Sequence, residues 1–205
     1  MFSSVGLLVS APLWVVFAVA IKAEDGGPVF YRQTRVGHGG HRFQVLKFRT
    51  LRVKADEVVR PWMVPDGTWV TRVGRLLRRT ALDELPQILN IARGDMSVVG
   101  PRAMPVDEFE ANRATMPSLE HRLAVRPGLT GIAQVYGKAT RDVKTKLRYD
   151  LLYVRSHTFL LDLKLVALSF WISLCGSWEG NGDDGRSGRR RRTGRNAAAP
   201  TGTPT

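Results

Sequence analysis

The chain has 205 residues, of which 43% are hydrophobic, enough for one folded domain with flanking segments and too many for a protein that is disordered throughout. Its net charge is +13, and ten of these net positive charges lie on residues 1–175, so the body itself predicts anionic partners: phosphates, lipid headgroups or nucleic acid. Cys175 is the only cysteine, which excludes an intrachain disulfide.

The N-terminal segment is apolar. Residues 1–21 contain no charged residue, and a helix that crosses a bilayer needs about 20 such residues. The segment lacks the basic start and the cleavage site of a secretory signal peptide. Pro12 removes a backbone donor and favours a kink or a break. Two arrangements stay open: a spanning helix kinked at Pro12, or two half-helices that dip into the membrane and return, with Lys22 in the headgroup region.

The first part of the body predicts a β-hairpin. Residues 29–31 and 43–48 have strand composition, and the glycine-rich residues 36–40 between them predict a tight turn. Residues 52–60 predict a helix, and residues 61–69 predict a loop.

The next segment, residues 74–92, has apolar residues at helical spacing and stops at Gly94, a residue type that ends helices. Pro86 is tolerated only in the first turn of a helix. We therefore expect a helix to begin near residues 80–83, after a separate helical segment at residues 75–79.

The remaining elements follow from the same patterns. They are a loop at 95–101, a helix at 106–116, a glycine-rich turn at 126–131, a strand at 132–135, and helices at 141–154 and 159–174. The last helix is strongly apolar and lies either in the core or at a membrane interface. From residue 176 the composition predicts disorder, and the arginine run after Ser187 either binds anionic lipid or is solvated.

Asp83 and Glu84 stand at the predicted helix start. Thr80 lies three residues before Asp83, as in a capping box, and the unpaired amides of a helix start lower the pKa of a carboxylate. In isolation such an aspartate is more often a helix cap. Neighbours on a helix point about 100° apart, which argues against two carboxylates facing across one glycosidic bond. The spacing suits one nucleophile and one metal ligand or proton acceptor.

Six motifs occur in a fixed order along the chain. They are Gly27-Pro28-Val29-Phe30-Tyr31-Arg32-Gln33, Arg35-Val36-Gly37, Lys47-Phe48-Arg49-Thr50, Leu82-Asp83-Glu84-Leu85-Pro86-Gln87, Met96-Ser97-Val98-Val99-Gly100-Pro101-Arg102 and Arg126-Pro127-Gly128-Leu129-Thr130-Gly131. Together they resemble the bacterial sugar transferase family, the monotopic phosphoglycosyl transferases that begin polysaccharide assembly. The resemblance covers nearly the whole folded body, up to about residue 174.

The residues and this resemblance together predict an α/β fold, mostly α with a small β-hairpin or sheet. Residues 1–25 would form a Pro-broken re-entrant membrane helix, residues 26–175 a compact cytoplasmic catalytic domain, and residues 176–205 a disordered Arg-rich tail. The resemblance implies transfer of a sugar 1-phosphate from a UDP-sugar to undecaprenyl phosphate, with release of UMP, at the cytoplasmic face of the bacterial inner membrane. Membrane lipids and downstream glycosyltransferases are the further partners it implies.

The resemblance also implies the site. The nucleophile would be Asp83, which would carry a covalent phosphosugar, and Mg²⁺ would be held by Asp83 and Glu84. The charges of the donor phosphates need cationic partners, and arginine binds phosphate oxygens in pairs. The candidates for this role are Lys47, Arg49, Arg102 and Arg126. A second arginine group, at Arg75, Arg78 and Arg79, suits lipid headgroups better.

Three features depart from the family pattern. The sequence begins inside the apolar helix, Ala11-Pro12 stands where the family often has Ser-Pro, and Pro101-Arg102-Ala103 stands where it has Pro-Arg-Pro. Two other functions compete with the enzyme. A catalytically inactive membrane scaffold of a glycan assembly system is opposed by the intact Asp83-Glu84 motif. A nucleic-acid-binding protein is suggested by the sequence pI of about 10.8 but lacks a recognisable binding module, so we expect no specific nucleic acid.

Overall fold

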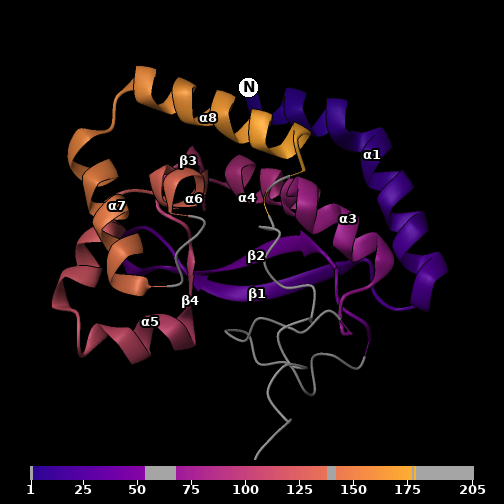
Figure 1. Ribbon diagram of the computed structural model, residues 1–205, viewed down its shortest axis with the longest axis horizontal. Coiled ribbons are helices and arrows are strands. Elements are labelled where there is room, and N and C mark those ends of the chain that lie inside the picture. The colour runs from indigo at the N-terminus through magenta and orange to yellow at the C-terminus, as the bar shows by residue number, and fades with distance from the viewer. Residues whose placement is uncertain (1, 54–67, 138–141, 177, 179–205) are drawn as a thin grey trace, which may run out of the picture.

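The computed structural model describes residues 2–53, 68–137, 142–176 and 178. Over these residues the chain is mostly helical with two small sheets, so the predicted α/β class is confirmed (Figure 1). The helix expected at residues 52–60, the loop at 61–69 and the tail after residue 178 lie mostly or wholly outside the described residues.

Helix α1, Phe2–Asp25, runs through Pro12 without interruption, and in Figure 1 its axis changes direction between its first turns and the rest. The last turns are attached to the body. The Ile21 side chain is buried, and the Glu24 carboxylate accepts hydrogen bonds from the amides of Arg72 and Val73 at the start of the next described helix. In the part of the chain that the structure describes, no helix is both long enough and apolar enough to cross a membrane.

Strands β1, Phe30–Val36, and β2, Arg42–Phe48, form an antiparallel hairpin, so the predicted hairpin is confirmed with a longer first strand. The 3₁₀ turn η1, His38–Gly40, joins them. Gly39 and Gly40 have positive φ angles there, a conformation that residues with a side chain rarely adopt. The short strand β4, Met104–Pro105, pairs with the other edge of β1.

Three helical segments follow in place of one long helix. They are α3, Arg72–Thr80; the 3₁₀ helix η2, Leu82–Gln87; and α4, Ile88–Arg93. The predicted break after α3 is confirmed, and Gly94 ends α4 with a φ of 85°, as expected. The helix expected to begin near residues 80–83 begins there only as a 3₁₀ helix, with Pro86 inside η2. The regular α-helix begins later, at Ile88.

The expected cap at Thr80 is wrong. Thr80 is the last residue of α3, where its hydroxyl donates to the carbonyls of Leu76 and Leu77, and no side chain caps the start of η2. Ala81 precedes η2 instead, with a φ of 55°. This left-handed residue turns the chain sharply between α3 and the segment that carries Asp83 and Glu84.

The second half of the chain forms a parallel two-stranded sheet covered by helices. Its strands are β3, Ser97–Val99, and β5, Gly128–Thr130, and its helical segments are α5, Val106–Arg113; η3, Pro117–Ala124; α6, Ile132–Tyr136; α7, Val143–Ser156; and α8, Phe159–Leu174. The strand expected at residues 132–135 is wrong, because this stretch is helix α6. All four of its residues are buried, and a short buried apolar run has no periodicity that separates strand from helix.

Helix α1 contributes directly to the core beside the segment η2. Ile21 of α1 packs with Phe48 of β2 and Leu77 of α3, and Leu82 and Leu85 of η2 contact this cluster. The catalytic candidates therefore stand on a segment that rests against the N-terminal helix.

Helix α8 keeps one apolar face exposed. Leu165 is fully buried, whereas seven large hydrophobic side chains are exposed, namely Phe159, Leu160, Leu163, Val166, Phe170, Trp171 and Leu174. In Figure 1, α8 and the first turns of α1 lie at the same edge of the molecule.

Candidate active site

The segment η2 is held against the edge of β2. Asn90, which is 1% exposed and lies on α4 directly after η2, accepts from the Leu46 amide at 3.1 Å and donates to the Gln44 carbonyl at 2.8 Å. The amide side chain thereby satisfies backbone groups on β2, which is an edge strand among the strands that the structure describes. Lys47, the next residue of β2, faces η2 as a result.

Glu84 is the centre of a charged cluster. Lys47 Nζ lies 2.5 Å from Glu84 Oε1, and Arg102 Nη2 lies 2.6 Å from the same oxygen. The side chains of Lys47 and Glu84 are 14% and 12% exposed, whereas that of Arg102 is 47% exposed. Burial alone would raise the pKa of Glu84, but Arg102 and Lys47 outweigh it and hold this pKa well below its usual range.

Asp83 has the opposite electrostatic situation. In the described part of the chain its carboxylate takes part in no hydrogen bond or ion pair. Burial, together with the charge of Glu84, raises its pKa to about 6, although Lys47 and Arg102 act in the other direction. The expectation that a helix start lowers the pKa of Asp83 is therefore wrong. At neutral pH the group is still mostly ionised, as a nucleophile must be.

Further cations surround the two carboxylates. The charge of Arg78 lowers the pKa of Asp83, and Arg35 interacts with Glu84 and Arg102. Burial, and then repulsion from Arg102, lowers the pKa of Arg35 to about 10, so it is still charged at neutral pH. A cluster this rich in positive charge suits a substrate with several phosphate charges.

A hollow opens beside this cluster. It is lined by Arg35, Val45, Lys47, Gln87, Met96, Arg102, Ala103 and Gly128. Three of these residues, Arg35, Lys47 and Arg102, are cationic. Gly128 has no side chain, so it exposes its backbone to the hollow.

The structure brings together four of the six residues singled out in the sequence: Asp83, Glu84, Lys47 and Arg102. Arg49 points elsewhere, since its guanidinium pairs with Asp25 and donates to the Pro28 carbonyl. Arg126 is exposed, and within the described residues no ion pair joins it to the cluster. Its role in phosphate binding stays a prediction.

The sequence argument missed Arg35 and assigned Arg78 to lipid headgroups. The signal for Arg35 was present, because it follows Tyr31 and Gln33 at every second position of β1, the half-buried face of the strand. Arg78 donates to the Thr50 hydroxyl at 2.9 Å and thereby lies inside the fold. No local pattern separates it from its neighbours Arg75 and Arg79.

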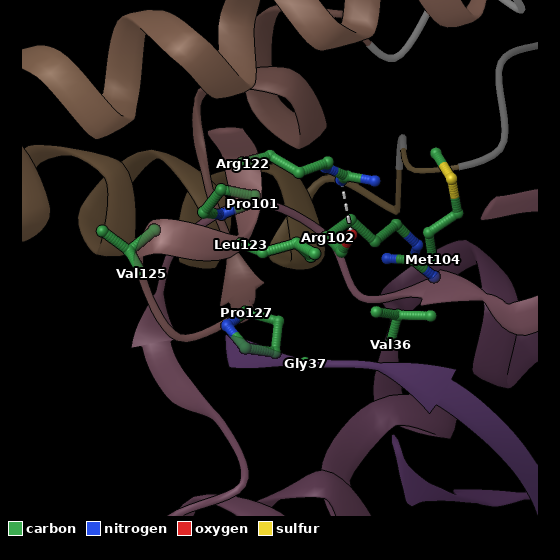
Figure 2. Close-up of a pocket in the computed structure, with 9 residues that line it drawn as sticks. All are labelled: Val36, Gly37, Pro101, Arg102, Met104, Arg122, Leu123, Val125 and Pro127. Carbon is green, nitrogen blue, oxygen red and sulfur yellow. Dashed lines mark hydrogen bonds between the residues drawn. The ribbon is translucent and has the colours of Figure 1, made fainter. Parts of the chain in front are cut away.

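A second pocket lies behind Arg102. Figure 2 shows its lining, with the Arg122 side chain reaching the backbone of Arg102 along the dashed line. The other residues around it are Val36, Gly37, Pro101, Met104, Leu123, Val125 and Pro127. Arg102 lines both this pocket and the hollow beside the charged cluster.

The sequence is similar to those of known proteins. The family described as bacterial sugar transferase matches residues 1–176. The exopolysaccharide production protein ExoY of Rhizobium meliloti is 41% identical over 179 residues, which is 80% of this chain and 78% of that protein. The UDP-glucose:undecaprenyl-phosphate glucose-1-phosphate transferase of Caulobacter vibrioides is 42% identical over 163 residues, 76% of this chain and 60% of that protein.

A protein named for a different sugar is also similar. The UDP-N-acetylgalactosamine-undecaprenyl-phosphate N-acetylgalactosaminephosphotransferase of Aeromonas hydrophila is 36% identical over 162 residues, 76% of this chain and 38% of that protein. Several relatives are therefore much longer than the matched region. The match spans the hairpin, the Asp83-Glu84 segment and the loop of Arg102 alike, and the chain belongs to the bacterial sugar transferase family.

Proposed function

We propose that this chain transfers a sugar 1-phosphate from a UDP-sugar to undecaprenyl phosphate and releases UMP. Relatives named for this reaction support the proposal. The observation that carries it is the arrangement at η2: an ionisable Asp83 without a protein partner in the described structure, next to Glu84 bound by Lys47 and Arg102.

The chemistry proceeds in two displacements. An Asp83 oxygen attacks the phosphorus that bears the sugar, the bond from this phosphorus to the bridging oxygen breaks, and UMP leaves with that oxygen. The product is an acyl phosphate between Asp83 and the sugar. A phosphate oxygen of undecaprenyl phosphate then attacks the same phosphorus, which releases the Asp83 carboxylate and forms undecaprenyl-diphosphate sugar. Lys47, Arg35 and Arg102 stabilise the charge on the phosphate oxygens.

The oxygen ligands present fit magnesium. Both cations bind Glu84 at Oε1, so Oε2 accepts no ion pair within the described residues, and Asp83 adds a second carboxylate. The described residues contain no group of three or more His, Cys, Asp or Glu side chains placed to hold a metal. Mg²⁺ commonly takes one or two carboxylates and completes its shell with water and substrate phosphates. When bound, it would neutralise phosphate charge.

We also propose that α1 enters the membrane and returns on the cytoplasmic side, with undecaprenyl phosphate delivered from the bilayer. Support comes from the bend of α1 and from the exposed apolar faces of α1 and α8. Single cysteines introduced as Ser4→Cys and Lys22→Cys in a Cys175→Ser background test the topology by labelling in oriented vesicles. A re-entrant helix places both on the cytoplasmic side, whereas labelling from opposite sides would show a spanning helix.

The reaction is tested with purified protein in detergent, undecaprenyl phosphate, Mg²⁺ and a panel of UDP-sugars that begins with UDP-glucose. We expect repeated turnover, read as UMP release, only with both the lipid and the metal, and at most about one UMP per protein when the lipid is left out. Asp83→Asn should abolish both, because an amide oxygen is a poor nucleophile. Asp107→Asn, at an exposed position of α5, is the matched control and should keep wild-type turnover.

Two results would contradict the proposal. Release by Asp83→Asn at the wild-type rate would remove Asp83 as the nucleophile. No release from any donor, with folded protein, would favour the inactive scaffold instead. Trapping the sugar-phosphate on wild-type protein in the absence of lipid, followed by mass spectrometry of the peptide that contains Asp83, tests the covalent step directly.

A further inference from the structure

The loop Pro101–Ala103 is held by three donors from three different elements. The amide of Gly128, on β5, donates to the Pro101 carbonyl at 2.9 Å. Arg122 Nη2, on η3, donates to the Arg102 carbonyl at 2.7 Å, and Arg35 Nη1, on β1, donates to the Ala103 carbonyl. Two of these three donors are guanidinium groups of buried or half-buried arginines.

Arg122 is itself fixed by a buried carboxylate. Its Nη2 lies 2.7 Å from Asp150 Oδ2 on α7, and both side chains are 5% exposed. The two hydrogens of Nη2 therefore serve one acceptor each: the Asp150 carboxylate and the Arg102 carbonyl. Burial raises the pKa of Asp150 to about 6, while Arg122 opposes this shift, so the pair is ionised at neutral pH.

Stability alone does not explain this pair. Elements η3 and α7 already pack through Leu119 and Leu147, which belong to one buried apolar cluster. An apolar pair of similar volume is often as stabilising as a buried ion pair, because both charges lose their hydration. Arg122 also leaves its Nε without a partner in the described structure. What the arginine supplies, and an apolar residue does not, is a fixed donor to the backbone of Arg102.

We propose that Arg122 and Asp150 are positioning residues that hold the backbone of Arg102, so that its guanidinium meets Glu84 and the donor phosphates. This role rests on the proposed function, in which Arg102 stabilises the charge on the donor phosphates. Arg102 is 47% exposed and extends from a loop, so the place where its guanidinium meets Glu84 depends on where this loop holds its backbone. Figure 2 shows the Arg122 side chain reaching the backbone of Arg102 along the dashed line.

The first test uses a double-mutant cycle on kcat/KM for UMP release. Arg122→Lys keeps the charge but has a shorter reach than the guanidinium, and we expect a loss on the order of 10-fold. The loss should nearly disappear when Arg122→Lys is introduced into Arg102→Ala, because the residue through which Arg122 acts is then absent. Asp150→Asn should behave in the same way. Arg113→Lys, in an exposed ion pair with Glu120 at 2.7 Å, is the matched control and should leave kcat/KM unchanged.

The second test needs no turnover. The dicarbonyl p-hydroxyphenylglyoxal modifies free guanidinium groups, and the rate at Arg102 is read by mass spectrometry of its peptide. We expect this rate to rise several-fold in Arg122→Lys and Asp150→Asn, while the exposed Arg42 keeps its wild-type rate as an internal reference.

The outcomes separate the two proposals. An unchanged rate at Arg102, together with a loss in kcat/KM that persists in Arg102→Ala, would show that the pair only supports the fold and would overturn the positioning role. If the wild-type protein releases no UMP, the proposed function fails, and the modification rate at Arg102 decides the positioning role by itself. Should Arg122→Lys fail to fold, Asp150→Asn carries both measurements.

Discussion

Two neighbouring carboxylates in this protein have pKa values that shift in opposite directions. The pKa of Glu84 is held low because Arg102 and Lys47 bind it, and that of Asp83 is raised to about 6 because burial and the charge of Glu84 oppose its ionisation. Such divergence between adjacent groups is typical of sites that give them different tasks. In the proposed mechanism Glu84 organises the cations and, with Asp83, would hold the metal, while an oxygen of Asp83 would attack the phosphorus.

The raised pKa of Asp83 makes activity pH-dependent. The nucleophile is the deprotonated form, so activity is retained above the pKa and lost as the pH falls through it. We expect kcat/KM for UMP release to fall tenfold per unit below about pH 6, with the change assigned to the free enzyme. Initial rates over roughly pH 5–8 check this, with circular dichroism at each pH to confirm folding. A flat profile on folded protein would contradict the assignment.

At the scale of the elements, β3 and β5 approach more closely than side chains allow. A Cβ atom added to Gly128 would lie 2.1 Å from the Gly100 amide nitrogen, and one added to Gly100 would lie 2.4 Å from the Arg126 carbonyl oxygen. The Gly128 amide also donates to the Pro101 carbonyl, so the close approach of these two strands fixes the position of the loop that carries Arg102. The glycine-punctuated motif after Arg126 is thereby explained by backbone packing next to the site.

Gly128→Ala should therefore affect both stability and activity. The new methyl group meets backbone atoms, which have no flexible end to move, so we expect the free energy of unfolding to fall by about 1–3 kcal/mol. Activity should fall as well, because the Arg102 loop must shift. Gly39→Ala is the contrasting variant, since its φ is 61° and nothing lies within 4 Å of the added atom.

In Gly39→Ala the free energy of unfolding should fall by about 1 kcal/mol, because alanine is strained in the left-handed conformation. The specific activity of this variant should stay at the wild-type value. Thermal or urea unfolding, combined with the UMP assay at a temperature where both variants are folded, measures the two effects. Equal specific activities of the two variants would show that the close approach of β3 and β5 does not position the site.

At the scale of the whole molecule, the charged cluster and the exposed apolar surface occupy one compact body. The apolar residues of α8 follow each other at helical spacing along one face, and Val15, Val16 and Val19 of α1 are exposed as well. Exposed apolar side chains of this kind suit contact with a membrane, which would hold the proposed lipid acceptor.

Replacing two aromatic residues of α8 should weaken membrane binding. The double variant Phe159→Ser with Phe170→Ser removes side chains that are 84% and 66% exposed, each worth at most about 1.5–3 kcal/mol on burial in lipid. We expect a smaller fraction of protein to float with undecaprenyl phosphate vesicles and a higher KM for the lipid, with kcat for bound substrate preserved. Leu152→Ser on α7 is the control and should leave flotation unchanged.

The amino-acid sequence by itself predicted the elements whose signals are local. The hairpin at β1 and β2, the break between α3 and the next segment, and the end of α4 at Gly94 follow from strand composition, Pro86 and a glycine. The Asp83-Glu84 segment, with Lys47 and Arg102, was recognised because its motifs occur in a specific order. The hydrophobic pattern did not distinguish a strand from a helix at residues 132–135, because all four residues are buried.

Only the tertiary structure decided which charges meet. Arg49 pairs with Asp25, which removes it from the cluster, whereas Arg35 enters it through the pairing of β1 with β2 and β4. The pKa of Asp83 was expected to fall and instead rises, because burial depends on what the rest of the chain packs above η2. Arg122 and Asp150 lie 28 positions apart and have no shared pattern in the sequence. Electrostatic energies depend on distance and burial in space, and chain order determines neither.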